Sequence, residues 1–311
     1  MNTLYFYTEL YNIVRNHKGV NPRIFAPLRK IISKIANYRI KQYLKQKDCA
    51  KVKYKQLDNV IVSITSFPDR INNIWMTIKT VMLQTYRPEK ILLWLSKEQF
   101  PKQEDIPSSL LELQDDFFQI IFVDGDLRSH KKYYYAMLRY PEKTIITLDD
   151  DTFYHPDIIK ALIDSSIKYP NCIIANHTKR LFYVNGELQP YRCWLADQPS
   201  YSCENQMQIG IGGVLYPPKS LHKDVINIDM FMNVTPRADD LWLNAMARLN
   251  HTKVVKSNRI FSYLLINDSS PSLASCNTYN GGNDLQLNRL REALFKKYGY
   301  DVYSYCNNLS D

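Results

Sequence analysis

Short apolar runs alternate with segments of helical period along residues 59–178, and this alternation restricts the possible folds more than any other feature of the chain. Strands that are apolar throughout are typical of sheets covered on both faces, and strands that alternate with helices form mostly parallel sheets. The sequence therefore predicts an α/β fold, Rossmann-like, with a mostly parallel central sheet flanked by helices. The runs that we assign to strands are NVIVSIT, KILLWLS, FQIIFVDGD, KTIITLDDD and NCIIANHT.

Residues 1–57 differ from the rest of the chain in charge. They contain 13 Lys and Arg and 2 Asp and Glu, a net charge of +11, whereas the rest of the chain contains 27 basic and 29 acidic residues. The net charge of the whole chain is +9, so its basic excess lies in this segment. A near-neutral body argues against a nucleic-acid groove and against nucleic acid as a partner.

We predict that this basic segment is a helical arm with one amphipathic helix. Such a helix can lie on the headgroups of an anionic membrane, or it can pack its apolar stripe on the body with its lysines in water, and the two are compatible. The apolar stripe is Leu28, Ile32, Ala36, Ile40 and Leu44, and the lysines are Lys30, Lys34, Lys41 and Lys45.

Nothing in the sequence predicts a spanning helix or a secretory route. There is no apolar run of about 18 residues and no signal-peptide pattern, and the six cysteines are scattered without a metal-binding spacing. We expect a cytoplasmic protein, peripheral at the inner face of the cell membrane if the arm binds lipid.

Residues 58–311 are expected to form one domain, because no flexible linker interrupts them. Residues 58–175 contain the alternating runs. Residues 176–266 contain turns, the Gly-rich stretch IGIGGV and a helix that begins near RADDLWL. Residues 267–311 contain a polar loop and a closing helix.

Three adjacent aspartates, Asp149, Asp150 and Asp151, end the fourth apolar run. A helix cap needs one carboxylate, so three indicate another use. Along an extended backbone Asp149 and Asp151 point to one side and Asp150 to the other. Hard carboxylate oxygens suit Mg²⁺ or Mn²⁺, which would also remove the repulsion among them. The triplet therefore predicts a metal site, with a solvated acidic turn as the alternative.

In its surroundings the triplet resembles the DxD motif of GT-A glycosyltransferases, in particular bacterial family 2-like enzymes of surface polysaccharide synthesis. The resemblance covers roughly residues 58–265. Besides the triplet it rests on TSFPDRI after the first run, on DLRSHKKYYYAM before the fourth, and on RADDLWL after the Gly-rich stretch.

This resemblance implies a metal-dependent, inverting transfer of a sugar from a nucleotide-diphosphate donor, with a UDP-sugar favoured, to a saccharide or lipid-linked acceptor. Residues 58–175 would be the nucleotide-sugar-binding half and residues 176–266 the acceptor and catalytic half. Asp151 would hold Mn²⁺ or Mg²⁺, with Asp149 beside it. The other residues implied for nucleotide binding are Ser66, Arg70, Asp126, Lys132 and Asp150.

The same resemblance implies that Asp240 is the base that removes the proton of the acceptor hydroxyl, supported by Asp239. Ala238 and Asp239 stand where the family commonly has Gly-Glu, so which acid is the base stays open. Two acids in the first turn of a helix can also act only as caps.

Several other residues have both a functional and a structural interpretation. Gly210–Gly213 would let the backbone approach a sugar closely, or form an ordinary turn. For Trp194 and Trp242 core packing is favoured over sugar stacking. For His155 and His251 a structural role is favoured over metal binding.

Three other functional classes explain the sequence less completely than a glycosyltransferase. A DxD metal-dependent phosphatase requires a Thr where Phe153 stands, and a sugar nucleotidyltransferase requires a Gly-rich loop where TSFPDR has no glycine. A membrane- or nucleic-acid-binding adaptor that uses residues 1–57 gives the aspartates no role.

Overall fold

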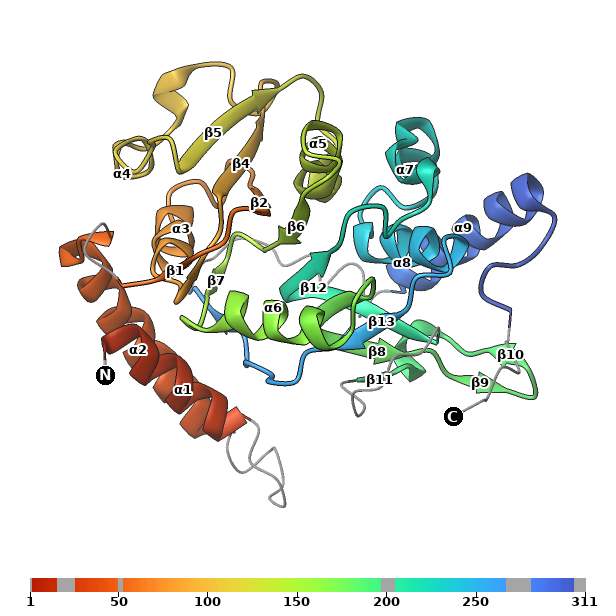
Figure 1. Cartoon of the computed structure of the whole chain (residues 1–311), viewed down its shortest axis with the longest axis horizontal. Coiled ribbons are helices and arrows are strands. Elements are labelled where there is room, and N and C mark those ends of the chain that lie inside the picture. The colour runs from red at the N-terminus through yellow and green to blue at the C-terminus, as the bar shows by residue number, and fades with distance from the viewer. Residues whose placement is uncertain (1, 16–25, 50–52, 197–204, 267–280, 305–311) are drawn as a thin grey trace.

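An eight-stranded sheet forms the centre of the computed structural model, which describes residues 2–15, 26–49, 53–196, 205–266 and 281–304. Within it β2 pairs in parallel with β4 and β6, and β4 with β5, whereas β12 runs antiparallel between β6 and β8. The predicted fold class, a mostly parallel sheet flanked by helices, is confirmed (Figure 1). In spatial order the strands are β11 (Leu195–Ala196), β8 (Ile173–Arg180), β12 (Gln206–Tyr216), β6 (Thr144–Thr147), β2 (Val60–Thr65), β4 (Lys90–Ser96) and β5 (Phe118–Val123), and β13 (Val254–Lys256) pairs with β8.

The strands alternate their side chains between two helical layers. Val62 and Ile64 of β2 lie in one apolar cluster with α3 and α6, and Ile61 lies in another with Ala136 of α5. Both faces are therefore buried, which explains why the strands are apolar throughout. The helices of the body are α3 (Ile74–Met82), α4 (Ser108–Leu111), α5 (Lys131–Arg139), α6 (Ile158–Lys168), α7 (Ile228–Val234), α8 (Asp239–Leu249) and α9 (Gly282–Tyr298).

Three short strand pairs lie outside the central sheet. They are β1 (Lys55–Gln56) with β3 (Tyr86–Arg87), β9 (Tyr183–Val184) with β10 (Glu187–Leu188), and β7 (Thr152–Phe153) with β14 (Leu264–Leu265). The last pair matters for the site, since β7 directly follows the three aspartates and β14 joins them to a distant part of the chain.

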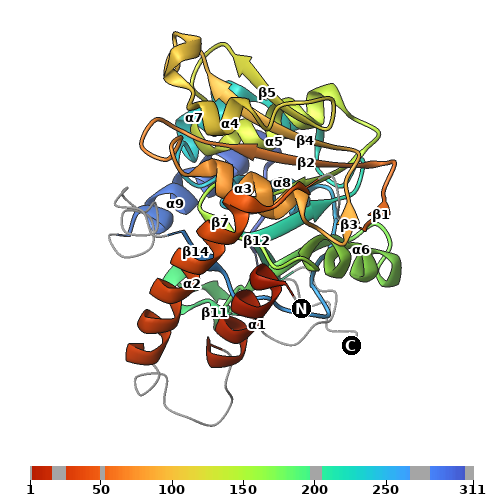
Figure 2. The same cartoon turned by 90° about the vertical axis from the view of Figure 1, so that its left-hand side faces the viewer.

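The basic arm consists of two helices, α1 (Thr3–Arg15) and α2 (Ala26–Gln46), which lie side by side in both views (Figure 1, Figure 2). Ala36, Ile40 and Leu44 of α2 are fully buried in the same apolar cluster as α3 and β2. The predicted packing of the arm on the body is therefore observed. Leu28 is an exception to the predicted stripe, because 42% of it is exposed.

The helices in the described parts of the chain include none that is both long and apolar enough to cross a membrane. The domain boundaries predicted after residues 57, 175 and 266 stay predictions, although the arm shares its core with the body. The loop assigned to the start of the last segment, residues 267–280, lies outside the described residues.

Because the arm shares a core with the body, a cavity in α2 should destabilise the whole domain. Ile40→Ala removes a fully buried side chain, so we expect the free energy of unfolding to fall by about 2–4 kcal/mol in a single denaturant transition. The matched control is Ile35→Ala on the same helix, where 48% of the side chain is exposed and the change should stay below about 0.5 kcal/mol. An Ile40→Ala variant that leaves the main transition unchanged would make the arm an independent unit.

Candidate active site

Polar side chains from four elements meet beyond the carboxyl ends of β2 and β6. The loop after β2 contributes Ser66 and Arg70, and the turn after β6 contributes the three aspartates. The first turn of α5 contributes Lys132, and the first turn of α8 contributes the acidic pair. This is the edge at which α/β sheets bind ligands, so the topology itself brings these distant motifs together.

Asp150 fixes the loop after β2 to the turn after β6. Its carboxylate accepts a hydrogen bond from Ser66 Oγ (2.6 Å) and one from an Arg70 guanidinium nitrogen (2.6 Å). Its backbone carbonyl accepts one from Thr77 Oγ1 of α3 (2.9 Å). Asp150 is buried, with both carboxylate oxygens occupied, so in this structure it positions its neighbours.

Arg70 also lies 2.9 Å from a carboxylate oxygen of Asp151 and so links two of the three aspartates. This single guanidinium does not balance the negative charge around it. Burial, followed by the charge of Asp149, raises the pKa of Asp151 to about 6 even beside Arg70. The site therefore has negative charge in excess, next to two carboxylates, Asp149 and Asp151, that are 28% and 22% exposed.

Lys132 connects the aspartate triplet to the acidic pair. Its ammonium lies 3.0 Å from Asp149 and 3.0 Å from Asp239, and only 8% of its side chain is exposed. Burial alone would lower its pKa, but the carboxylates of Asp149 and Asp239 outweigh burial and raise the pKa well above its usual value. Lys132 is therefore charged at any physiological pH and holds two acids from different motifs in place.

Asp239 and Asp240 are adjacent in the chain but differ in their ionisation. Burial acts to raise the pKa of Asp239, but the positive charge of Lys132 outweighs it and lowers that pKa. For Asp240, burial and the nearby charge of Asp239 raise the pKa to about 7. Of the two, Asp240 therefore has the proton affinity that suits a general base near neutral pH.

Glycine at position 210 allows β12 to pass close to Asp240. The backbone N–H of Gly210 donates to a carboxylate oxygen of Asp240 (3.0 Å). A Cβ added at Gly210 would meet Asp240 at 3.0 Å and Lys132 Nζ at 3.2 Å. Gly210 thus lets the chain approach an acid of its own, and the predicted approach of this backbone to a sugar stays a prediction.

The orientation predicted for the three aspartates rests on a wrong assumption, that they continue the strand. The strand β6 ends at Thr147, so the alternation of an extended backbone does not govern the aspartates. Asp150 and Asp151 share Arg70, while Asp149 turns to Lys132.

Asp126, which the resemblance also implies for nucleotide binding, has partners other than those of Lys132. It accepts hydrogen bonds from Lys131, the neighbouring residue on α5, and from Gln99 Nε2 (2.9 Å). Its part in nucleotide binding stays a prediction.

The weaker candidates lie away from the aspartates or inside the core. Trp242 is fully buried and donates through its indole nitrogen to Val225 O (3.0 Å), and Trp194 donates to Gln189 O (2.8 Å). His155 stacks on Phe261 and contacts the arm helix α1. His251 is exposed at the end of α8. The structural interpretation favoured for these four residues agrees with where they lie.

Two residues of the site were missed in the sequence. The hydroxyl of Tyr154 accepts from the backbone N–H of Asp149 (2.7 Å) and donates to its carbonyl (3.2 Å), so it holds the triplet's turn. His130 is close enough to Asp239 to feel its charge, but burial lowers the pKa of His130 to about 4, so its ring is neutral. The ring donates a hydrogen bond to Thr235 O (2.7 Å). Tyr154 lies outside the motifs, and His130 lies within DLRSHKKYYYAM but is not one of the residues to which the resemblance gives a role. Neither residue gave a signal that could have identified it.

Asp149 and Asp151 are the partly exposed carboxylates of the site that could hold a divalent ion. The described residues contain no group of three or more His, Cys, Asp or Glu side chains arranged to hold a metal ion. However, Mg²⁺ usually takes only one or two carboxylates and completes its shell with water and phosphate oxygens. Burial, followed by the charge of Asp149, raises the pKa of Asp151, and a cation bound there would oppose both effects.

Comparisons with known proteins give no family assignment. No family model matches the chain, and no curated protein matches it. Among solved structures it is similar to apo UDP-glucose pyrophosphorylase, at 10% identity over 78% of this chain and 99% of that one, with a TM-score of 0.42. A complex of UDP-glucose pyrophosphorylase with UDP-glucose has 10% identity over the same shares and a TM-score of 0.39. A 4-diphosphocytidyl-2C-methyl-D-erythritol synthase from Anaerococcus prevotii has 15% identity over 73% and 98%, with a TM-score of 0.41.

Replacing Lys132 should destabilise the domain in a pH-dependent way. In Lys132→Met the carboxylates of Asp149 and Asp239 lose their shared cation, so we expect the free energy of unfolding to fall by about 2–4 kcal/mol near pH 8. Without the cation the folded-state pKa of Asp239 rises, so the deficit should shrink as the pH falls toward about 5 and this acid takes up a proton. Denaturant unfolding at both pH values measures this.

A matched control for this variant is Lys97→Met, which breaks an ion pair whose partners are 55% and 88% exposed. That change should cost less than about 0.5 kcal/mol at either pH. If Lys132→Met behaves like this control, Lys132 does not hold the two acidic motifs together.

Proposed function

We propose that this protein is a metal-dependent, inverting glycosyltransferase of GT-A type that transfers a sugar from a nucleotide-diphosphate donor to a saccharide or lipid-linked acceptor. One observation carries the proposal: the aspartate triplet and the acidic pair meet across the ammonium of Lys132, which lies 3.0 Å from an acid of each. A single site thus offers carboxylates for a metal–diphosphate and, beside them, a separate acid with a pKa of about 7.

In the proposed reaction Asp240 accepts the proton of an acceptor hydroxyl. That oxygen forms a bond to the anomeric carbon of the donor sugar from the side opposite the diphosphate. The bond from the anomeric carbon to the diphosphate oxygen breaks, and the nucleoside diphosphate leaves with the electron pair. Asp239, kept ionised by Lys132, raises the pKa of Asp240 and so makes it a better proton acceptor.

The other residues bind and orient the donor. Asp151, with Asp149 beside it, would hold Mn²⁺ or Mg²⁺, which when bound would neutralise the charge of the leaving diphosphate. Arg70, anchored by Asp150, to which Ser66 also donates, would contact the nucleotide, and a UDP-sugar is the favoured donor.

Details of the site weigh against the other classes considered. A DxD phosphatase needs a small hydroxyl side chain where Phe153 is fully buried in β7. A sugar nucleotidyltransferase needs glycines in the loop after β2, where this chain has Ser66 and Arg70 bound to Asp150. An adaptor has no use for an acid whose pKa is raised to about 7 beside a buried lysine.

The first test is metal-dependent nucleotide binding. Thermal unfolding with UDP, GDP, CMP or dTDP, each with and without Mn²⁺, should show a rise in melting temperature of several degrees for one nucleotide only when the metal is present. Asp151→Asn should abolish that rise, whereas Asp124→Asn, an exposed acid at the end of β5, should keep it. A metal-dependent rise that survives in Asp151→Asn would refute the metal assignment.

A second test separates binding from proton transfer. Asp240→Asn should keep the metal-dependent shift with nucleotide but lose transfer by about 10²–10⁴-fold, because an amide cannot accept the proton.

For the unmodified enzyme kcat/KM should rise with pH through a midpoint at or below about 7, since the base must be deprotonated and a bound metal lowers its pKa. If Asp239→Asn keeps binding and loses transfer while Asp240→Asn stays active, the base is Asp239. Pyrophosphate-dependent formation of a nucleoside triphosphate would instead make the protein a nucleotidyltransferase.

A further inference from the structure

Helix α2 has a second apolar stripe that faces away from the protein. The stripe of Ile32, Ala36, Ile40 and Leu44 is buried against α1 and the body. Four apolar side chains on the other side of the helix are exposed: Leu28 by 42%, Ile31 by 56%, Ile35 by 48% and Tyr38 by 64%. Their spacing of three and four residues places them on one face, so the helix presents a continuous apolar strip to solvent.

Basic side chains border this outer strip. At 100° per residue, lysines lie along one edge of it and Arg39 along the other, all of them exposed. Helix α2 contains no Asp or Glu at all. An exposed apolar strip edged by lysines is the pattern of helices that lie in the plane of an anionic membrane surface. The lysines are Lys30, Lys34, Lys41 and Lys45.

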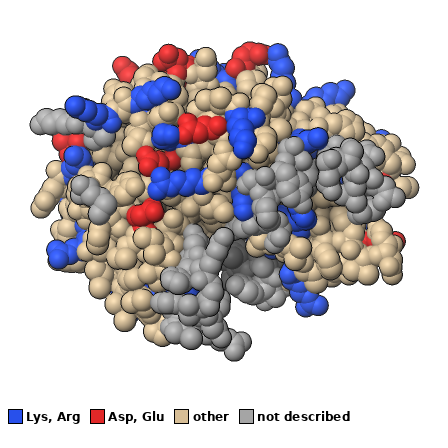
Figure 3. All heavy atoms as spheres, turned by 60° about the horizontal axis from the view of Figure 1, so that its bottom comes forward, with Lys and Arg blue, Asp and Glu red and all other residues tan. Residues whose placement is uncertain are grey.

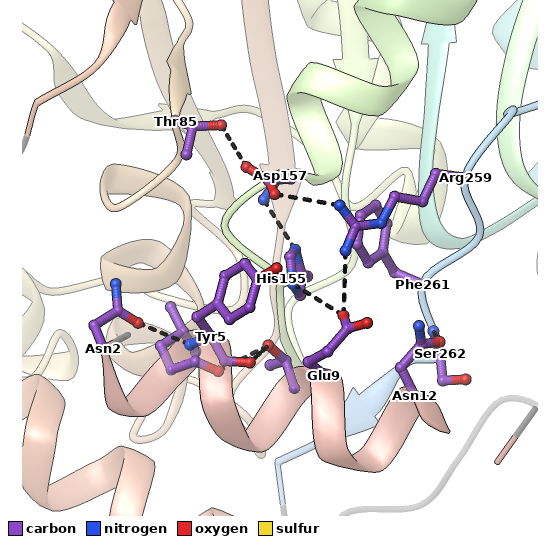
Figure 4. A network of polar contacts seen from close by, with 12 residues as sticks. Asn2, Tyr5, Glu9, Asn12, Thr85, His155, Asp157, Arg259, Phe261 and Ser262 are labelled. Carbon is purple, nitrogen blue, oxygen red and sulfur yellow. Dashed lines mark hydrogen bonds and ion pairs between the residues drawn. The ribbon is translucent and has the colours of Figure 1, made fainter. Parts of the chain in front are cut away.

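The orientation of this strip is fixed, because both helices of the arm are attached to the body. On α1, Glu9 lies 3.3 Å from Arg259 and 3.3 Å from His155, whose ring contacts Tyr5 (Figure 4). On α2, the side-chain amide of Asn37 donates to Leu265 O (3.0 Å). The outer face of α2 is therefore exposed as a consequence of how the arm is held.

The charge distribution complements an anionic surface. Residues 1–57 carry a net charge of +11, whereas the remainder of the chain is close to neutral. When the lower side of Figure 1 is turned forward, Asp and Glu gather mainly in the upper part of that face (Figure 3). Among the described residues in its lower part, few side chains are charged, and most of those are basic. A second copy of the same strip would be repelled by its lysines, so the charges favour lipid over self-association.

We propose that the outer face of α2, consisting of Leu28, Ile31, Ile35 and Tyr38 with the lysines along its edge, docks into the headgroup region of an anionic membrane. The apolar side chains enter the boundary between headgroups and acyl chains, and the lysines bind lipid phosphates and carboxylates. This docking surface does not rest on the proposed sugar transfer. If that transfer is correct, docking restricts the acceptor to one that the site can reach from a bilayer.

The test uses the full chain and vesicles of phosphatidylcholine with or without phosphatidylserine. The protein should sediment with the anionic vesicles only, and added salt should weaken the binding. A double variant, Ile31→Glu with Ile35→Glu, should bind roughly tenfold more weakly or worse, because two charges would enter the apolar boundary. Lys30→Gln with Lys34→Gln should reduce both the binding and its dependence on salt.

The matched control carries the same substitutions at exposed apolar residues elsewhere, Ile167→Glu with Leu285→Glu, which are 73% and 53% exposed on α6 and α9. The control should bind vesicles like the unmodified protein. Equal loss in the control, or no binding of the unmodified protein to anionic vesicles, would overturn the proposal. So would sedimentation as a dimer that the Ile31→Glu and Ile35→Glu variant abolishes, since a second copy would then cover this face.

These outcomes are independent of the nucleotide test. The variants lie on an exposed helix face and should keep the melting temperature and the nucleotide-dependent shift of the unmodified protein. A truncation of residues 1–57 would not serve, because Ile40 and Leu44 belong to the core that α3 and β2 share.

Discussion

The arrangement of the site depends on one buried ammonium group, that of Lys132. Its position between Asp149 and Asp239 brings the turn after β6 and the start of α8 to within a few ångströms of each other. Five carboxylates with only two cations beside them would repel one another strongly in a site that excludes much of the water. The backbone of Lys132 is itself fixed, because its carbonyl accepts a hydrogen bond from Ser63 in β2. The central strand of the sheet thus determines where the shared charge lies.

The difference between Asp239 and Asp240 follows from this arrangement. Lys132 and Asp239 form a close pair, so Asp239 stays ionised. Asp240 has the backbone N–H of Gly210 as a partner and faces the negative charge of Asp239, so it retains a high affinity for a proton. Two identical side chains in sequence acquire different chemistry because one is nearer to the cation than the other.

Strand β12 was not predicted, because its Gly-rich stretch was assigned to a region of turns. The sequence was sufficient to predict the parallel strands of the sheet, since hydrophobic runs and helical periods depend on local pattern. It also placed Ser66, Arg70 and the aspartates together, because parallel strands end at a common edge. It was not sufficient to predict the pairing among the charges. The assignment of Asp149 and Asp151 to one side assumed an extended backbone, whereas β6 ends at Thr147 and a turn follows. The role of His130 depends on a contact with Thr235 in a distant segment, for which no local pattern exists. The role of Tyr154 depends on the turn that brings its hydroxyl back to the backbone of Asp149, whereas an extended backbone was predicted there.

The strand pair between β7 and β14 gives the site a mechanical connection to the arm. The backbone carbonyl of Asp151 accepts a hydrogen bond from Ile266 (2.7 Å), and a few residues earlier Arg259 and Ser262 bind Glu9 and Asn12 of α1. Residues 259–266 thus bind the arm at one end and Asp151 at the other, and these contacts keep both at fixed positions. The distance and the orientation of the aspartates relative to any surface that binds α2 are therefore determined by the fold of the protein.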